Sequence, residues 1–250
     1  MTEPKGVIVI TGAGRGIGAA TAKLAAARYD VCVNYRNDRD SAEAVVEAIE
    51  REGGRALAVR ADVTVEDDIV RLFETVDRDL GRVTALVNNA GILERHTRVE
   101  EMDAGRLTRV LAANVTGPFI CAREAVRRMS TRYGGSGGAI VNISSIASRL
   151  GSPNEYVDYA ASKAALDALT IGLAKEVAED GIRVNSISPG VVYTELHASG
   201  GEPARVDRVK ESVPMKRGGQ PIEVARAVLW MLSDEASYVT GSVLEVSGGR

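Results

Sequence analysis

The 250-residue sequence contains little cysteine, little histidine and no excess of positive charge. Its two cysteines, Cys32 and Cys121, lie inside apolar segments and form no Cys-x-x-Cys pattern, so neither a disulfide framework nor a thiolate metal site is indicated. Only two histidines are present, His96 and His197, which argues against a histidine-built metal site. No metal is therefore expected in the function.

Charge and hydropathy argue against two further classes of partner. The net charge is -3 and the 31 basic residues are scattered, so the sequence shows no basic cluster of the kind that binds nucleic acid or an anionic membrane. No apolar stretch approaches the length that crosses a bilayer, and the first residues lack the pattern of a signal peptide. The default expectation is a cytoplasmic protein that acts on a small molecule.

Short β-rich runs alternate with helical patterns along the whole chain. The runs are 5–11, 31–35, 56–60, 83–87, 139–143, 182–187 and 243–246. Apolar residues are continuous within these runs rather than alternating, which is typical of parallel strands covered on both faces. No linker or shift in composition divides the chain. We therefore expect an α/β fold, with one doubly wound Rossmann-like domain of about seven strands over residues 1–250.

A glycine-rich turn follows the first strand and precedes a helical segment at 19–27. It fits two spacings, Gly14-x-Gly16-x-x-Ala19 and Thr11-Gly12-x-x-x-Gly16-x-Gly18. Either spacing places bare backbone N–H groups at a helix N-terminus, where a pyrophosphate is stabilised. A glycine turn can also be purely structural, but its place between a strand and a helix favours cofactor binding.

Tyr159 and Lys163 are four residues apart in a segment with strong helix propensity, so they project from one helix face. A nearby ammonium favours the ionised form of a phenol, which lowers its pKa and suits it to exchange a proton with a reacting oxygen. The same spacing is common on ordinary helix surfaces, so other motifs have to decide. Tyr156 has Ala160 four residues on instead of a lysine, and we assign it to a loop.

The glycine turn, Asn88-Asn89-Ala90-Gly91 and the Tyr159/Lys163 pair together resemble the short-chain dehydrogenase/reductase family, over nearly the whole chain. The general pattern looks like its ketoacyl reductase and sugar dehydrogenase branches. The resemblance implies hydride transfer between a nicotinamide cofactor and a carbonyl or alcohol. Tyr159 would then exchange the proton with the substrate oxygen, while Lys163 lowers its pKa and binds the nicotinamide ribose.

The resemblance also implies two supporting residues. Ser145 would donate a hydrogen bond to the substrate oxygen, although it lies one residue further from Tyr159 than is usual in the family. Its neighbour Ser144 would need a still longer loop, and Ser162 is expected to make only packing or local contacts. Asn114 would hold a water next to Lys163 and so link it to bulk solvent.

Further positions are implied to bind the cofactor, with Asp62 and Val63 reaching the adenine and Thr194 belonging to the segment that covers the nicotinamide. Capping for Asp62 and turn formation for Asn88-Asn89 remain as alternatives. The expected cofactor set is Gly12, Gly14, Arg15, Gly16, Ile17, Gly18, Tyr35, Arg36, Asp62, Val63, Asn89, Ala90, Gly91, Tyr159, Lys163, Pro189, Gly190, Val192 and Thr194.

Charge at the end of the second strand bears on the cofactor. Where an acidic residue would bind the ribose hydroxyls of NAD, this chain has Tyr35 followed by Arg36, and the glycine turn adds Arg15. Two guanidinium groups suit a 2′-phosphate, because they offer charge-assisted and bidentate contacts. We therefore predict NADP(H), while Asp38 and Asp40 nearby keep NAD(H) as the alternative.

The segment at about 193–215 resembles the family's substrate-covering loop. It is rich in charge and poor in large apolar residues, which favours a polar substrate over a steroid, although a solvated mobile loop explains the composition equally well.

Family members are commonly homotetramers, and the alanine-rich stretch 160–174 permits close helix packing. Two other functions remain open: a non-catalytic nucleotide-sensing module of the same fold, and an NAD-preferring sugar or polyol dehydrogenase.

Overall fold

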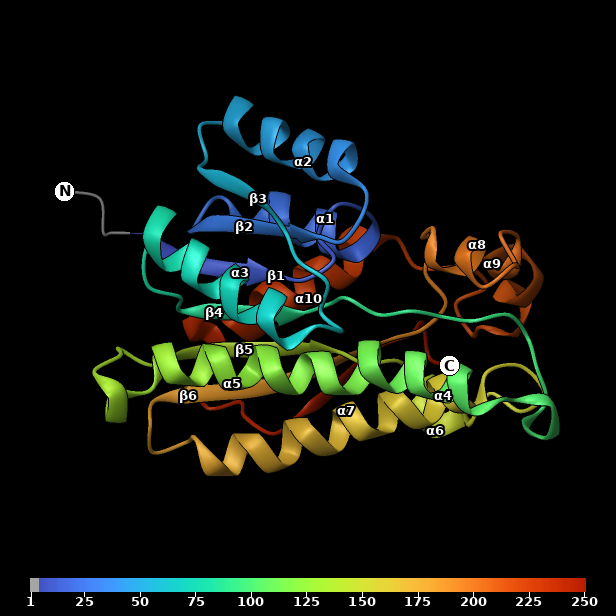
Figure 1. Cartoon of the computed structure of the whole chain (residues 1–250). Coiled ribbons are helices and arrows are strands. Elements are labelled where there is room, and N and C mark those ends of the chain that lie inside the picture. The colour runs from blue at the N-terminus through green and yellow to red at the C-terminus, as the bar shows by residue number, and fades with distance from the viewer. Residues whose placement is uncertain (1–4) are drawn as a thin grey trace.

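Seven parallel strands form one sheet in the computed structural model, which describes residues 5–250 (Figure 1). Their order in the sheet is β3-β2-β1-β4-β5-β6-β7. The strands are β1 (Gly6–Ile10), β2 (Tyr29–Tyr35), β3 (Ala56–Arg60), β4 (Ala85–Asn88), β5 (Gly138–Ile143), β6 (Ile182–Pro189) and β7 (Val243–Val246). Each overlaps a run expected from the sequence, and the Rossmann-like α/β class is confirmed. The order reverses between β1 and β4, where such sheets bind ligands beyond the carboxyl ends of the strands.

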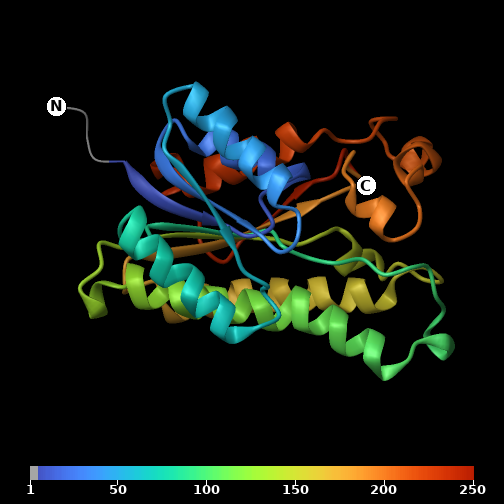
Figure 2. The same cartoon turned by 45° about the horizontal axis from the view of Figure 1, so that its top comes forward.

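Helices cover both faces of this sheet (Figure 2). The α-helices are α1 (Gly16–Ala25), α2 (Arg39–Arg51), α3 (Glu66–Asp79), α4 (Ala104–Leu111), α5 (Gly117–Met129), α6 (Ala147–Leu150), α7 (Val157–Glu176), α8 (Leu196–Ser199), α9 (Arg205–Val209) and α10 (Pro221–Leu232). Short 3₁₀ turns occupy η1 (Val99–Glu101), η3 (Thr131–Tyr133), η4 (Lys210–Ser212) and η5 (Asp234–Ala236), and η2 (Ala112–Thr116) is a π-helical turn. Within residues 5–250, none of these helices has the length and hydropathy to span a bilayer.

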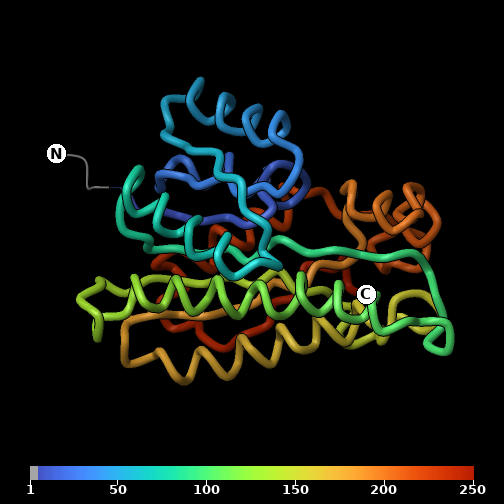
Figure 3. The backbone as a smooth tube through the Cα atoms, in the orientation of Figure 1, coloured from blue at the N-terminus to red at the C-terminus, as the bar shows by residue number. Residues whose placement is uncertain are grey.

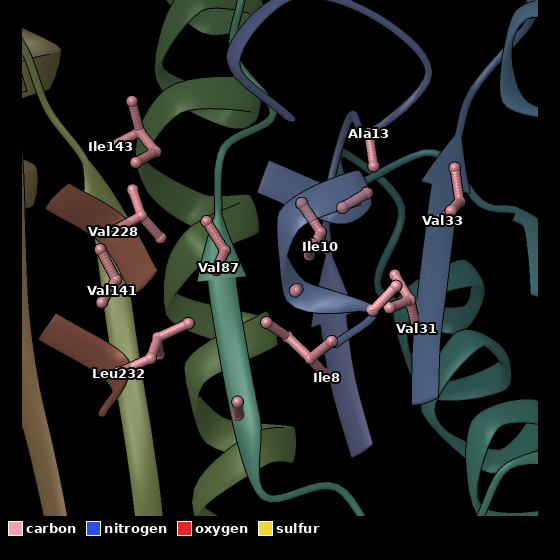
Figure 4. Packing of buried hydrophobic residues seen from close by; sticks show 14 of the residues in the cluster. Ile8, Ile10, Ala13, Val31, Val33, Val87, Val141, Ile143, Val228 and Leu232 are labelled. Atoms are coloured by element: carbon pink, nitrogen blue, oxygen red, sulfur yellow. The ribbon is translucent and has the colours of Figure 1, made fainter. Parts of the chain in front are cut away.

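The sheet is buried on both faces, which explains its continuous apolar strands. In β1, Ile8 and Ile10 pack on the side of α10, against Val228 and Leu232 among others (Figure 4). Val7 and Val9 point to the opposite face and pack with residues of α3 and α5, such as Phe73. Successive strand residues alternate between faces, so both sets of positions have to be apolar. The core therefore holds the carboxyl ends of the strands in fixed register.

The helical stretch from Ala104 to Met129 is divided by the π-helical turn η2, just before Gly117-Pro118. Pro118 has no N–H to donate to the carbonyl of Asn114 four residues earlier, so the regular ladder is interrupted there. The two halves, α4 and α5, run alongside α7 (Figure 3). Asn114 is fully buried between them, and the irregular turn presents it to the helix that carries Tyr159.

Candidate active site

A pocket of about 1170 Å³ lies along the carboxyl ends of the central strands, from the glycine turn to the first turn of α7. Most residues expected at the site line it: Gly12, Gly14, Arg15, Gly16, Ile17, Tyr35, Arg36, Asp62, Val63, Asn89, Ala90, Gly91, Ser145, Tyr159, Lys163, Pro189, Gly190, Val192 and Thr194. Gly18 and Asn114 are not among the lining residues and are buried. The loops after β1, β4, β5 and β6 thus converge on one cavity.

The glycine turn has a shape that only glycine adopts easily at two positions. Gly12 and Gly16 have φ values of 63° and 55°, in the left-handed region where a side chain is strained. At Gly18 the constraint is packing, since an added Cβ would lie 2.6 Å from both Asn89 Nδ2 and the Gly12 carbonyl oxygen. Gly18 therefore lets α1 approach the neighbouring loop, and it is set behind the pocket wall instead of contacting a ligand.

Helix α1 begins at this turn with no side-chain cap and no acidic residue in its first turn. Its free N–H groups and the positive end of its dipole face the pocket region lined by Gly16 and Ile17. The bare backbone, the absence of an acidic side chain in the first turn and the length of the pocket fit a dinucleotide with its pyrophosphate at Gly14 to Ile17.

Thr11 and Asn89 join the loops that follow β1 and β4. Thr11 Oγ1 accepts hydrogen bonds from the backbone N–H groups of Asn89 and Ala90, each at 3.0 Å. The Asn89 amide in turn donates to the carbonyl oxygens of Thr11, at 2.9 Å, and Gly12, at 3.0 Å. These contacts give the Asn89 side chain a structural role in holding the glycine turn, which the sequence analysis did not anticipate.

Two carboxylates near the end of β2, Asp62 and Asp38, are engaged by their own chain. Asp62 accepts from the Thr64 N–H at 2.9 Å and the Thr64 hydroxyl at 2.8 Å. Asp38 caps α2 by accepting from the N–H of Ser41 at 3.0 Å and from its hydroxyl at 2.7 Å, and these bonds lower the pKa of Asp38. Arg36 remains 55% exposed at the pocket wall, 3.8 Å from Asp62.

The two serines after β5 have different surroundings. Ser144 is buried and its hydroxyl donates to the backbone oxygen of Lys163 at 3.2 Å, so it ties β5 to α7. Ser145 lines the pocket, and hydrogen bonding with Ser145 lowers the pKa of Tyr159. The geometry favours Ser145 at the reacting oxygen.

The loop that carries the extra residue before α7 places Ser152 and Asn154 at φ values of 44° and 61°, unusual for residues other than glycine.

Lys163 is buried and lies 5.6 Å from the centroid of the Tyr159 ring, while its ammonium donates to the Ile143 carbonyl at 2.7 Å. Burial lowers the pKa of Lys163 to about 8. Burial also raises the pKa of Tyr159 to about 12, and outweighs the lowering by Ser145 and Arg205. Desolvation therefore sets the direction in which the pKa of Tyr159 moves in this structure, and the Lys163 ammonium is turned to Ile143. That Lys163 favours the ionised form of Tyr159 stays a prediction.

Asn114 connects the loop after β4 to the catalytic helix. Its side-chain oxygen accepts from the Ile92 N–H at 2.8 Å, and its amide donates to the Ile92 carbonyl and to the Ser162 hydroxyl, both at 3.0 Å. Ser162 donates in turn to the Tyr159 backbone oxygen at 2.7 Å, a local contact as expected. A Cβ on Gly91 would meet Asn114 at 3.2 Å and Lys163 Nζ at 3.6 Å, so both residues lie just behind this loop.

Tyr156 lies in a loop, as the sequence analysis assigned it, at the position immediately before α7. Its burial was not anticipated: it is only 2% exposed and lines the pocket. Its ring lies between the His96 ring, 4.5 Å away between centroids, and the Arg205 guanidinium, 4.8 Å from the ring centroid. No spacing rule signals these contacts, because the partners are far apart in the sequence.

The segment at 193–215 forms α8 and α9 instead of an open loop, beside the carboxyl ends of the strands (Figures 1 and 2). An ion pair binds it to the loop just before α7, where Arg205 donates to Glu155 at 2.6 Å. Within the segment, Arg205 also donates to Glu202 at 3.1 Å. Arg208 donates to Glu155 at 3.0 Å. His197 and Arg205 from this segment line the pocket, and neither was singled out from the sequence. The segment therefore forms one wall of the site.

Comparison with known proteins agrees with this architecture. The family model described as Enoyl-(Acyl carrier protein) reductase matches residues 12–250. The uncharacterized oxidoreductase YgfF of Escherichia coli is 56% identical over 98% of this chain and 99% of its own length. Glucose 1-dehydrogenase 2 of Bacillus subtilis is 37% identical over 96% and 93%.

Solved structures agree as well. A dehydrogenase/reductase from Sinorhizobium meliloti superimposes with a TM-score of 0.90 at 35% identity, covering 98% of this chain and 95% of that one. A short-chain dehydrogenase/reductase from Serratia marcescens gives 0.90 at 33%, covering 98% and 97%. The chain therefore belongs to the short-chain dehydrogenase/reductase family of oxidoreductases.

Proposed function

We propose that this protein is an NADP(H)-dependent oxidoreductase that interconverts a carbonyl and an alcohol, with Tyr159 as the acid and base. One observation carries the proposal: Ser145, Tyr159 and Lys163 all line the same pocket whose far end is the glycine turn. A serine hydroxyl and a phenol in one pocket wall can provide two hydrogen bonds to a substrate oxygen.

The chain's own residues divide the remaining tasks. The N-terminus of α1 binds the pyrophosphate, and Arg15 and Arg36 bind the 2′-phosphate. When bound, the nicotinamide supplies or removes the hydride. Ser145 orients the substrate oxygen, while Tyr159, with a pKa of about 12, holds its proton at neutral pH and gives it to that oxygen during reduction. Lys163, beside Asn114, is the cation that stabilises the phenolate that remains.

The preference for NADP(H) rests on charge at the end of β2. The Asp62 and Asp38 carboxylates are engaged by Thr64 and Ser41, and Arg36 keeps its guanidinium exposed at the pocket wall. An exposed guanidinium favours a phosphate over an uncharged ribose hydroxyl. An NAD-preferring sugar dehydrogenase is the second candidate, because the 37% identical Bacillus subtilis relative is named a glucose 1-dehydrogenase.

Steady-state turnover tests the proposal, measured as oxidation of NADPH and NADH with ketones, aldehydes and acyl thioesters and as reduction of NADP and NAD with sugars. The proposal predicts turnover with at least one carbonyl class and a higher kcat/KM with NADPH. Better turnover of sugars with NAD would establish the second candidate. Cofactor binding without any turnover would instead establish a nucleotide-sensing module.

A homotetramer is the assembly that we propose. The outward face of α4, α5 and α7 exposes the apolar residues Leu111, Phe119 and Ile171. Small residues of α7 lie on the same face, such as Gly172, where an added Cβ would meet no atom within 4 Å. On the other side, Trp230 and the edge strand β7 are partly exposed. Two such faces provide the two interfaces that a dihedral tetramer needs. Light scattering on the purified protein would show four chains, and a monomer would refute this assembly.

The segment at 193–215 is proposed to cover the substrate, because its residues His197 and Arg205 line the pocket near Tyr156.

We further propose a cytoplasmic protein, since Cys32 and Cys121 are both free and buried, which suits a reducing compartment. Fractionation of cells that express the tagged protein checks the compartment.

A further inference from the structure

Two polar atoms in the pocket wall are buried without a hydrogen-bond partner. They are the Tyr156 hydroxyl and His197 Nδ1. Within residues 5–250 only one other side-chain atom shares this condition, Ser148 Oγ, and Ser148 does not line the pocket. Buried polar groups are nearly always paired, so an unpaired group at a ligand cavity indicates a partner supplied by the ligand.

Tyr156 is held rigidly while its hydroxyl is left free. The side of its ring contacts His96, and the Arg205 guanidinium stacks over the ring instead of completing a hydrogen bond with the hydroxyl. Arg205 is itself fixed by Glu155 and Glu202 and is only 11% exposed at its side chain. The chain thus fixes the position of the phenol and buries its oxygen with no partner at hydrogen-bonding geometry, in a residue that lines the pocket.

His197 lies on α8 and lines the cavity together with Tyr156. Burial lowers the pKa of His197 and the Arg205 cation lowers it further, so the imidazole is neutral at pH 7. A neutral ring nitrogen and a phenol both form hydrogen bonds with uncharged groups. Arg205 acts electrostatically on His197, Tyr156 and Tyr159, which places all three in one neighbourhood.

We propose that Tyr156 and His197 form a second polar subsite that hydrogen-bonds a hydroxyl group of the substrate, away from the carbonyl held by Ser145 and Tyr159. The inference rests on the proposed function and adds the substrate class, a neutral hydroxyketone and the corresponding diol. The two residues determine specificity and take no part in the proton transfer.

A neutral hydroxyl fits better than a carboxylate because the nearest cation is already neutralised. The two carboxylates of Glu155 and Glu202 pair with Arg205 at 2.6 Å and 3.1 Å. An apolar substituent fits worse, since it would leave both polar atoms buried and unpaired. Arg95 and Arg250 also line the pocket, so an anionic substrate is the outcome that the test has to separate.

The test compares cyclohexanone with 2-, 3- and 4-hydroxycyclohexanone and with 4-oxocyclohexanecarboxylate, using NADPH oxidation by the wild-type enzyme and Tyr156→Phe. The wild type should prefer at least one hydroxyketone over cyclohexanone, and Tyr156→Phe should reduce that preference in kcat/KM by about tenfold, as for one hydrogen bond. His197→Leu should reduce the same preference. Tyr193→Phe is the matched control, because its hydroxyl binds Asp207 at 3.1 Å outside the pocket.

An unchanged preference in Tyr156→Phe, or a wild type that favours the carboxylate, overturns the subsite. Thermal unfolding adds a second criterion: Tyr156→Phe should be at least as stable as the wild type, because no internal hydrogen bond is lost, and a clear loss of stability would show an internal partner. If no ketone is turned over, the proposed function fails separately. Calorimetric titration of 1,2-, 1,3- and 1,4-cyclohexanediol against cyclohexanol, into wild type and Tyr156→Phe, then decides the subsite alone.

Discussion

The Lys163 ammonium donates its hydrogen bond to the backbone oxygen of Ile143, 2.7 Å away at the end of β5. This contact holds a buried cation against the sheet, 5.6 Å from the Tyr159 ring centroid. Desolvation sets the pKa of both groups, lowering that of Lys163 to about 8 and raising that of Tyr159 to about 12. At neutral pH Lys163 is therefore still mostly an ammonium, although its pKa lies well below its ordinary value, and Tyr159 is a protonated phenol.

The pKa of Lys163 predicts a pH dependence of stability. Between about pH 8 and its ordinary value of 10.5, the unfolded chain binds more protons at this lysine than the folded chain, so the free energy of unfolding rises with pH. A Lys163→Met variant lacks this rise. The difference in free energy of unfolding, wild type minus variant, should increase across this window and be flat outside it.

Urea unfolding of both proteins at several pH values measures this difference. Tyr159, whose pKa is raised, acts in the opposite direction between about pH 10 and 12, but it is present in both proteins. Lys175→Met, at an exposed position near the end of α7, serves as the control and should parallel the wild type. If the difference in free energy of unfolding between the wild type and Lys163→Met does not change between about pH 8 and 10.5, Lys163 is not desolvated in the folded protein.

Replacement of Arg36 tests the cofactor preference. Arg36→Ala removes an exposed guanidinium from the pocket wall, so kcat/KM with NADPH should fall by roughly 10- to 100-fold, the range for charge-assisted hydrogen bonds, while kcat/KM with NADH stays within about twofold. Arg39→Ala is the matched control, since this arginine pairs with Glu43 on α2 outside the pocket. Equal losses with both cofactors in Arg36→Ala would contradict the assignment.

A buried ion pair supports the start of the catalytic helix. Arg106 of α4 binds Asp158 of α7 through two hydrogen bonds, of 2.7 Å and 3.2 Å, and the two side chains are 8% and 2% exposed. Arg106→Met leaves the Asp158 carboxylate buried and uncompensated, so the free energy of unfolding should fall by about 3–5 kcal/mol.

Denaturant unfolding of Arg106→Met checks this loss. The double variant Arg106→Met/Asp158→Leu removes both charges and should recover much of the stability. In Arg109→Met, on the same helix, only an exposed pair with Glu94 is lost, which is expected to cost at most about 1 kcal/mol. A loss for Arg106→Met as small as that for Arg109→Met would refute a stabilising role for the buried pair.

Local sequence patterns were sufficient for the strands and for placing most of the expected site residues at one pocket. Continuous apolar runs predict the central strands because both faces of the sheet are buried there, and the glycine turn and the Tyr159/Lys163 pair each depend on short spacings. The preference for Ser145 over Ser144 is supported, because Ser144 is occupied with the Lys163 carbonyl.

Contacts between distant segments were beyond the reach of those patterns. Asn34 holds the glycine turn by accepting from the Gly12 N–H at 3.2 Å, and this depends on the packing of β2 beside β1. Tyr156 becomes a pocket residue only because His96 and Arg205 enclose it. The raised pKa of Tyr159 likewise follows from burial in the folded protein, which a helical spacing does not report.

The most direct test of the account is turnover by Tyr159→Phe. This variant should bind NADPH as the wild type does, by fluorescence titration, and lose about 10²- to 10⁴-fold in kcat with the best carbonyl substrate, because the proton donor is gone. Tyr238→Phe, at a fully exposed position, should keep full activity. Wild-type kcat in Tyr159→Phe with intact cofactor binding would contradict the assignment of Tyr159 as the acid.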